Sequence, residues 1–171
     1  LVAPIAEPDE KQWVKVLLPD GREGYTKESY LGTWYAGHSF SEEEFRQRVC
    51  ETALTYLGTH YRWGGKSPLG IDCSGLTCYI FKAVGIKLER TAYNQGYDDT
   101  YTKIEGWQNL KRGDVVFFNT ISDSDLSDHA GIYIGDGYFI HASSGAHKVV
   151  VSNLTTGYYG RVFSWGRRIL N

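Results

Sequence analysis

The sequence has few residues of several types, and what it lacks argues against complete internal disulfide pairing, a membrane span and nucleic-acid binding. Its 171 residues include no methionine, four prolines and only three cysteines, an odd number that cannot all pair within the chain. No apolar run approaches the ~20 residues that a membrane-spanning helix requires. The formal net charge is only −2, which gives no electrostatic footprint for nucleic acid. We therefore expect no membrane span and no nucleic-acid partner.

The cysteines and histidines also lack the spacing of a metal site. The cysteines are Cys50, Cys73 and Cys78, and no C-x-x-C or Cys/His grouping with zinc-ligand spacing occurs. We therefore expect no metal and no other cofactor. The chain begins at Leu1, so we also expect that the native start, with any targeting segment, lies upstream.

The strongest local signals lie between Tyr61 and Gly85, a glycine-rich loop that runs into a helix. Apolar residues then recur at the spacing of one helical face: Leu76, Tyr79, Ile80, Ala83 and Val84. Asp72 is a candidate N-cap and Gly85 a C-terminal stop, which places Cys73 in the first turn. The positive end of the helix favours a thiolate there, so Cys73 is a candidate nucleophile. A small buried residue is the alternative, because free cysteines are mostly buried.

The flanking sequence predicts an α+β domain. A capping box at Ser41-Glu42-Glu43-Glu44 begins a helix that should end at Gly58. Its predicted apolar face consists of Phe45, Val49, Ala53, Leu54 and Leu57. Later strands are expected at 115–118, 129–135, 138–142, 149–151 and 160–170. Because helices come first and an antiparallel sheet follows, the pattern is α+β.

Leu1 to Leu31 reads as β structure. Gln12 to Leu18 alternates, Pro19-Asp20-Gly21 predicts a turn, and a return strand begins at Gly24. The pattern W-x-K-V-x-L-P-D-G-R-x-G-Y resembles the later strands of a bacterial SH3-type barrel. We therefore expect residues 1–35 to form a small, partial SH3-like β domain. The linker is expected at residues 30–39, and a second domain at 36–171.

A nucleophilic cysteine needs a base, and the chain offers five histidines. His38, His60 and His147 are expected to be surface or hydrogen-bonded residues. His129 and His141 differ because they flank one hairpin. A thiolate–imidazolium pair needs one ring beside the sulfur and a second polar group that fixes the tautomer of that ring. Two histidines on adjacent strands can do both.

The length of the hairpin loop decides whether the two rings share a face of the sheet. A two-residue Asp136-Gly137 turn alone puts His129 and His141 on opposite faces. A three-residue loop at 135–137 pairs Gly131 with His141, which makes the two imidazoles diagonal neighbours on one face. We predict the three-residue loop or an equivalent bulge.

Four motifs are diagnostic in combination. They are Tyr61-x-Trp63-Gly64-Gly65…Asp72-Cys73-Ser74-Gly75-Leu76, Gly113-Asp114-Val115-Val116-Phe117-Phe118, His129-Ala-Gly131-Ile-Tyr-Ile-Gly135 and Phe139-Ile140-His141-Ala142. Together they resemble the NlpC family of bacterial cell-wall cysteine peptidases. The resemblance covers about residues 42–168. It implies a trimmed papain-like fold, with N-terminal helices packed on a central antiparallel sheet.

The resemblance also implies roles for particular residues. Cys73 is the expected nucleophile, His129 the base and His141 the third, orienting residue. Tyr61 would help to hold the substrate carbonyl near the Cys73 N–H, as part of an oxyanion hole.

Two further residues beside the nucleophile, Asp72 and Ser74, would contact the substrate. The Asp72 carboxylate could pair with a free α-ammonium, which is worth roughly 1.5–3 kcal/mol when well hydrogen-bonded. An N-cap role alone is the alternative for Asp72.

An SH3-type domain directly before such a domain is similar to the dipeptidyl-peptidase VI subgroup. That subgroup cleaves free wall peptides with an unblocked L-Ala, between γ-linked D-Glu and the diamino acid. The expected substrate is therefore a peptidoglycan-derived peptide. The expected enzyme is a monomer of the bacterial cell envelope, periplasmic or exported, with a cytoplasmic recycling enzyme as the alternative.

Other functions stay open. An endopeptidase that cuts intact peptidoglycan should accept a blocked N-terminus, which an exopeptidase anchored by Asp72 should reject. A non-catalytic wall-binding module should have a thiol that does not react with iodoacetamide at acidic pH. An aminoacyl or lipid acyltransferase on the same superfold is a further candidate.

Overall fold

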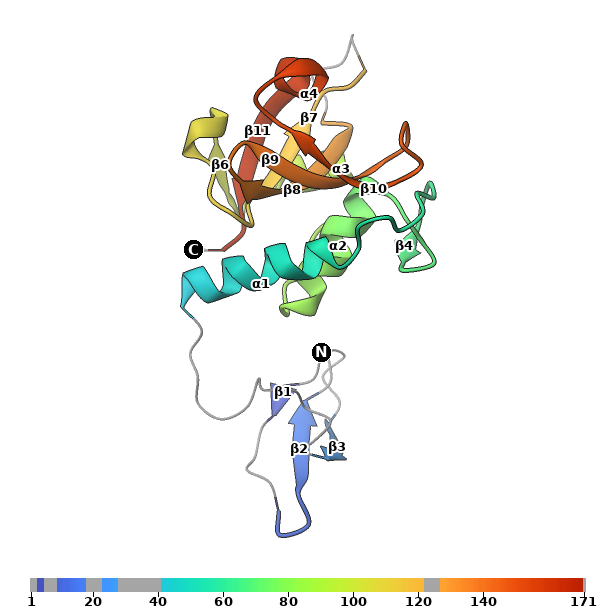
Figure 1. The fold of residues 1–171 in the computed structure, drawn as a ribbon. Helices are drawn as coiled ribbons and strands as arrows, with labels where there is room; N and C mark the ends of the chain where they lie inside the picture. The colour runs from blue at the N-terminus through green and yellow to red at the C-terminus, as the bar shows by residue number, and fades with distance from the viewer. Residues whose placement is uncertain (1–2, 5–8, 18–22, 28–40, 122–126, 171) are drawn as a thin grey trace. The chain divides into compact units, whose positions relative to one another are not determined.

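A computed structural model describes residues 3–4, 9–17, 23–27, 41–121 and 127–170 of the chain. The chain divides into two compact units, Leu1–Ser41 and Glu42–Asn171 (Figure 1). The predicted turn at 19–21, the predicted linker at 30–39 and His38 lie outside the described residues.

The first unit is a small antiparallel sheet in the described residues, with strand order β1-β2-β3. Its strands are β1 (Ala3–Pro4), β2 (Trp13–Leu17) and β3 (Glu23–Lys27). Val14 and Val16 of β2 are buried, whereas the Trp13 side chain is 41% exposed. The predicted alternating strand and its return strand are therefore confirmed. An SH3-type barrel stays a prediction.

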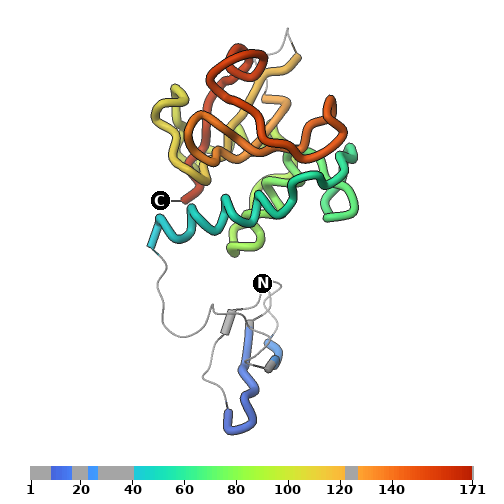
Figure 2. Tube along the Cα trace, in the orientation of Figure 1, coloured from blue at the N-terminus to red at the C-terminus, as the bar shows by residue number. Residues whose placement is uncertain are grey.

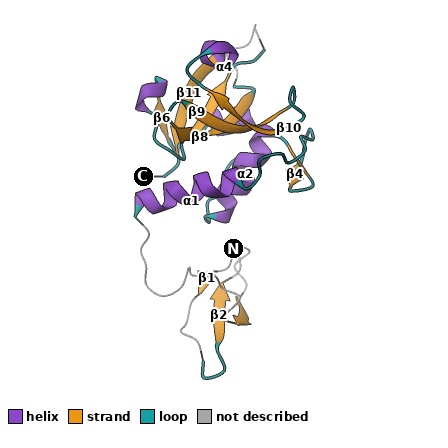
Figure 3. Cartoon of the chain, viewed as in Figure 1, coloured by secondary structure: helices purple, strands orange, loops and turns teal. Residues whose placement is uncertain are grey.

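The second unit combines helices with an antiparallel sheet, as Figure 3 shows. Its helices are α1 (Glu42–Leu54), α2 (Cys73–Ala83), α3 (Ala92–Tyr97), α4 (Gly157–Val162) and a 3-10 turn at Trp107–Asn109. Its strands are β4 (Lys66–Ser67), β5 (Gly70–Ile71), β6 (Thr102–Ile104), β7 (Val115–Phe118), β8 (His129–Gly135), β9 (Tyr138–Ser143), β10 (Lys148–Asn153) and β11 (Phe163–Arg168). The predicted α+β class is confirmed.

The main sheet of the second unit has the described strand order β10-β9-β8-β7-β11-β6, and all of its pairs are antiparallel. The path of the chain through it can be followed in Figure 2. β8 and β9 are neighbours, with β7 on the other side of β8 and β10 on the outer side of β9. The hairpin that carries both histidines is therefore supported on each side.

The two faces of the sheet have separate cores. α1 and α2 lie against the face to which Val115, Phe117, Ala130, Ile132 and Ile140 belong (Figure 1). The other face carries Val116, Phe118, Tyr133 and Phe139, which pack with Tyr159 and Val162 of α4. Successive residues of β7 thus alternate between two apolar layers, which explains why this strand is apolar throughout.

The first helix differs from its prediction at the C-terminal end. α1 stops at Leu54 rather than at Gly58, because Tyr56 and Leu57 donate to carbonyls three residues back and tighten the chain into a turn. Leu54 and Leu57 are consequently 39% and 48% exposed instead of buried. The buried face of α1 is formed by Arg46, Val49, Cys50 and Ala53.

Arg46 is buried in α1 because every part of its guanidinium has a partner. It donates to Asp114 Oδ1 at 3.0 Å, to Leu170 O at 2.6 Å and to Arg112 O at 2.8 Å. A buried charge that is paired and hydrogen-bonded in this way is tolerated. The interaction connects α1 with the start of β7 and with the end of the chain.

The last predicted strand also begins later than expected. Residues 157–162 form α4, so β11 starts at Phe163 rather than at Gly160. Gly160 lies where an added Cβ would approach the Thr155 backbone carbon at 2.8 Å. Residue 160 is therefore a glycine because the α4 backbone packs closely there, and not because a strand begins at this position.

The β8–β9 hairpin confirms the bulge alternative and not the three-residue loop. Gly135 pairs with Tyr138 across a two-residue turn, and the register shifts between Tyr133 and Gly135. Beyond this bulge Ile132 pairs with Ile140. The bulge therefore restores the parity that places His129 and His141 on one face.

Candidate active site

The glycine-rich loop and α2 are joined by the Asp72 cap. Asp72 has an extended backbone, and its Oδ1 accepts a hydrogen bond from Gly75 N at 2.6 Å. Asp72 is thus the N-cap of α2, and Cys73 is its first helical residue, as predicted. Gly85, with a φ of 83°, follows the C-cap Val84 and confirms the predicted stop.

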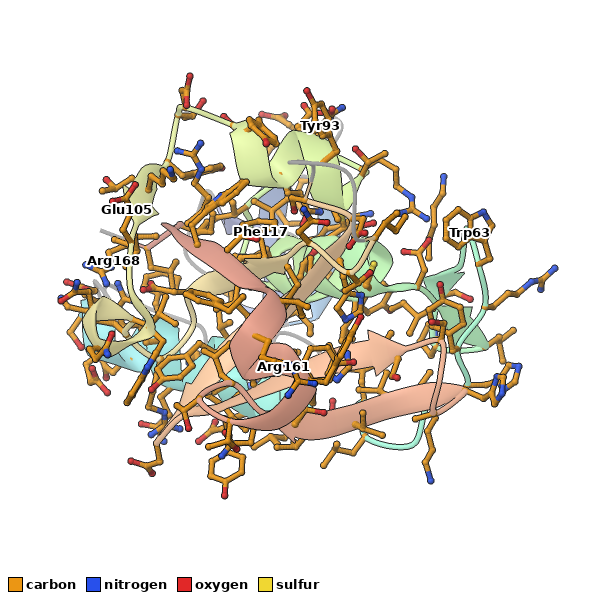
Figure 4. All side chains as sticks on the ribbon, turned by 90° about the horizontal axis from the view of Figure 1, so that it is seen from above. Trp63, Tyr93, Glu105, Phe117, Arg161 and Arg168 are labelled. Atoms are coloured by element: carbon orange, nitrogen blue, oxygen red, sulfur yellow. The ribbon has the colours of Figure 1, made fainter. Side chains whose placement is uncertain are left out.

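Two glycines allow the loop to lie directly on the start of α2. A Cβ on Gly75 would clash with the carbonyl oxygen of Gly65, and a Cβ on Gly65 would clash with the carbonyl oxygen of Gly70. The backbone of the loop therefore fits against the helix only because both residues lack side chains. Trp63 of the same loop is 88% exposed and stands at the edge of the unit, whereas Phe117 lies at its centre (Figure 4).

Cys73 is a free thiol at the point where β8 and β9 separate. The β8–β9 pairing ends at Ile132 and Ile140, and α2 contacts both strands. Burial raises the pKa of Cys73 above its ordinary value, whereas the backbone N–H of Ala130 lowers that pKa by hydrogen bonding to the sulfur. The thiol therefore lies beside the residue that follows His129.

His129 and His141 are joined by a direct hydrogen bond. His129 Nε2 and His141 Nδ1 are 2.8 Å apart, and the two rings are nearly perpendicular at 87°. Gly131 makes this arrangement possible, because a Cβ there would approach the Phe139 ring at 2.7 Å. The bond occupies the Nε2 atom of His129, so Nδ1 is the ring nitrogen that a proton transfer would use.

The second histidine is enclosed. His141 is completely buried, with the Phe139 ring stacked on it at 4.6 Å and the Tyr159 ring edge-on at 4.9 Å. Its other nitrogen, Nε2, is 3.0 Å from Ser152 Oγ on β10. His129, His141 and Ser152 thus form a row across three neighbouring strands.

Burial dominates the electrostatics of the row. It lowers the pKa of His129 from 6.5 to about 4, against an opposing effect of Asp128. Burial, together with the charge on His129, lowers the pKa of His141 to about 2. Burial thus outweighs the helix end that favours a thiolate at Cys73, so the site is charged only if thiolate and imidazolium form together.

Asp72 and Ser74 are held by a residue that the sequence did not single out. Arg90 donates to Asp72 Oδ2 at 2.7 Å, to Asp72 Oδ1 at 3.1 Å and to Ser74 Oγ at 2.9 Å. Asp72 and Ser74 are 7% and 5% exposed. Their polar atoms are therefore turned mainly toward Arg90, and the Asp72 charge is already paired.

Tyr61 lies near the nucleophile from the other side of the loop. Its backbone bridges to Ile71, and its N–H donates to His147 O at 2.9 Å. Burial raises the pKa of Tyr61, and negative charges on Cys73 and Asp72 raise it further. Tyr61 is therefore a neutral hydroxyl close to the sulfur. The structure places all six predicted site residues around the start of α2 and the open end of the hairpin.

Three residues that contact the site were not found from the sequence: Arg90, Ser152 and Tyr159. Arg90 directly precedes Thr91, the N-cap of α3, and nothing in that stretch of sequence indicates Asp72 as its partner. Ser152 lies in a strand that was recognised by its valines. Tyr159 comes from α4, which was expected to be extended.

The described residues contain neither a metal-binding cluster nor a membrane-spanning helix. No group of three or more His, Cys, Asp or Glu side chains is close enough there to hold a metal ion. In the same part of the chain no helix is both long and apolar enough to cross a bilayer.

The layered arrangement, with α1 and α2 against an antiparallel sheet, is a papain-like α+β fold. A solved NlpC/P60 family protein from Bacillus cereus superposes with a TM-score of 0.68 and 26% identity, over 99% of this chain and 54% of that protein. The sequence profile of the NlpC/P60 family matches residues 58–168. The chain therefore belongs to the NlpC/P60 family of peptidases.

Two curated relatives cover most of the chain. Dipeptidyl-peptidase 6 of Lysinibacillus sphaericus is 38% identical over 83% of this chain and 49% of its own length. Murein DD-endopeptidase MepH of Escherichia coli is 32% identical over 87% of this chain and 57% of its own length. The chain thus spans about half the length of the curated relatives that it matches.

Proposed function

We propose that this chain is a cysteine peptidase that hydrolyses the γ-D-glutamyl–diamino acid bond of peptidoglycan peptides. The preferred substrates are short free peptides with an unblocked N-terminal L-Ala. The observation that carries the proposal is the 2.8 Å hydrogen bond between His129 and His141, at the end of the hairpin where the Cys73 thiol meets the Ala130 N–H. A wall-binding module has no use for these three groups together.

The reaction begins with a proton transfer. His129 Nδ1 takes the proton of Cys73, and the resulting thiolate attacks the γ-glutamyl carbonyl carbon. The carbonyl oxygen becomes an oxyanion, which the Cys73 N–H and the Tyr61 hydroxyl stabilise. The C–N bond then breaks as His129 gives its proton to the departing amine, leaving a thioester.

Water completes the cycle. His129, now neutral, removes a proton from a water molecule that attacks the thioester, and the returning proton releases the Cys73 thiol. His141 accepts a hydrogen bond from His129 Nε2–H throughout, which holds the ring in place and stabilises its charged form. Charge separation in a buried site is costly, so this fixed partner is essential for reaching the ion pair.

Asp72 and Ser74 are proposed to line the side of the site that receives the amino-terminal part of the substrate. Because Arg90 already neutralises Asp72, the carboxylate offers a substrate ammonium less than an unpaired charge would. The name of the Lysinibacillus sphaericus relative supports a dipeptide-releasing activity. A free amino terminus should therefore matter, but by a modest factor.

The test compares L-Ala-γ-D-Glu-L-Lys and L-Ala-γ-D-Glu-diaminopimelate with their N-acetylated forms, with products followed by mass spectrometry. We expect cleavage after D-Glu, slower with the acetylated peptides, and no cleavage by Cys73→Ala. Cys50→Ala is the matched control, because Cys50 is a buried thiol on α1 away from the loop. Turnover by Cys73→Ala would rule out the mechanism.

An endopeptidase on intact peptidoglycan is the second candidate, because the Escherichia coli relative is named a murein DD-endopeptidase. This function predicts equal cleavage of acetylated and free peptides and release of fragments from purified sacculi. We propose that the enzyme acts in the bacterial cell envelope, periplasmic or exported, with a cytoplasmic recycling enzyme as the alternative. We also propose that the chain is monomeric and that residues 1–35 belong to an SH3-like domain, which size-exclusion chromatography and an experimental structure would test.

A further inference from the structure

We infer that Ser152 is a positioning residue that fixes the tautomer of His141 and, through it, the direction in which His129 handles its proton. The inference rests on the proposed function for its catalytic consequence. The geometry on which it depends lies entirely within the sheet of the second unit. Ser152 stands on β10, two residues beyond Val150, which pairs with His141.

The environment of His141 leaves its Nε2 atom no alternative partner in the described residues. The ring is completely buried, between Phe139 on one side and the edge of Tyr159. Solvent cannot reach a ring with no exposed surface, so Ser152 Oγ at 3.0 Å is the group that satisfies Nε2. The titratable groups that face His141 are His129 from β8 and Tyr159 from α4.

The proton on His141 can sit on either nitrogen, and only one choice serves the reaction. If Nε2 carries it, Nε2–H donates to Ser152 and the Nδ1 lone pair accepts from His129 Nε2–H. His129 Nδ1 is then unprotonated and able to take the thiol proton. If Nδ1 carries it instead, His141 donates to His129 Nε2, and the only hydrogen of neutral His129 moves to Nδ1.

Ser152 favours the productive choice because its hydroxyl is a good acceptor that can turn its own hydrogen to solvent. The residue is only partly buried, so its O–H has water available while Oγ receives the imidazole N–H. The serine thus acts on His129 across a distance of two hydrogen bonds, without touching the substrate.

The direct test is the tautomer of His141 in the unliganded protein, read from the nitrogen chemical shifts of 15N-histidine-labelled samples. We expect Nε2–H for His141 in the wild-type protein and a mixture of both tautomers in Ser152→Ala. Ser152→Thr, which keeps the hydroxyl, should restore the wild-type pattern. An Nδ1–H form of His141 in the wild-type protein, or no change in Ser152→Ala, would overturn the inference.

The kinetic test uses the same variants on the free tripeptide. Ser152→Ala removes the hydrogen bond between the neutral Ser152 hydroxyl and His141 Nε2. The loss of one such bond predicts that kcat/KM falls by about 2- to 12-fold. The acidic limb of the pH profile should also move to lower pH, because the imidazolium of His129 loses part of its support. Ser152→Thr should recover both values. Ser144→Ala, in the exposed turn after β9, is the matched control and should leave them unchanged.

The two readouts separate the inference from the function on which it rests. A wild-type Nε2–H tautomer together with hydrolysis by Cys73→Ala would reject the cysteine mechanism and keep the positioning role. The expected kinetics of Cys73→Ala together with an unchanged pH profile and tautomer in Ser152→Ala would keep the mechanism and reject the role of Ser152.

Discussion

The two buried imidazoles make the stability of the second unit depend on pH in a calculable way. Both rings have a folded-state pKa far below 6.5, because burial disfavours their charged forms. Their contribution to stability is therefore complete above the unfolded pKa and is lost as the pH falls through the interval between 6.5 and the folded pKa of about 4 for His129. For His141 the loss of stability continues to lower pH, because its folded-state pKa is about 2.

The magnitude follows from proton uptake by the unfolded chain. Between pH 7.5 and pH 5, unfolded histidines with an ordinary pKa take up nearly one proton each, and the folded site takes up almost none. The free energy of unfolding should fall by about 2 kcal/mol for each ring and by about 4 kcal/mol for both. Replacing His141 by glutamine, which cannot titrate, should therefore halve the decrease.

The assay is urea unfolding at pH 7.5 and pH 5, followed by tryptophan fluorescence, for the wild-type protein, His141→Gln and His147→Gln. His147 lies exposed in the turn between β9 and β10, so its removal should leave the full decrease in place. A full decrease in His141→Gln would refute the reasoning. If His129→Gln does not reduce the decrease, His129 is charged at neutral pH, and the resting enzyme already holds the thiolate–imidazolium pair.

Other perturbations test the packing around the site. Gly75→Ala should lower Tm and stability by about 1–3 kcal/mol, because its Cβ would clash with the Gly65 carbonyl; an unchanged Tm in a melting curve would contradict the close contact. Arg46→Met should cost about 1–3 kcal/mol in urea unfolding, because the buried Leu170 carbonyl loses its donor while Asp114 keeps Arg168 as a counter-charge, and an unchanged stability would reject Arg46 as an important contact. Addition of EDTA should leave tripeptide hydrolysis unchanged; a loss restored by a divalent metal would show that the cysteine mechanism is incomplete.

Local signals were sufficient to predict the elements that carry the site. The N-cap Asp72 and the stop at Gly85 are read from neighbouring residues, and both were found where they were expected. The shared face of His129 and His141 was predicted because strand parity leaves only two choices. The prediction allowed either a three-residue loop or an equivalent bulge, and the structure has the bulge, between Tyr133 and Gly135.

Partners that are distant in sequence could not be predicted. Arg90 reaches Asp72 across 18 residues, and nothing in either segment specifies the pairing. Arg46 was not among the predicted buried residues of α1, because its buried position depends on Asp114 and on Leu170, which are distant in sequence. In each case the contact follows from tertiary packing, which overrides the local preference of the residue.

The position of β11 has a consequence for the growing chain. This strand inserts between β7 and β6, so in the described sheet β7 has only β8 as a neighbour, and β6 has none, until residues 163–168 have been made. On a ribosome, the sulfhydryl at position 73 would emerge long before the sheet that supports its two imidazoles is closed.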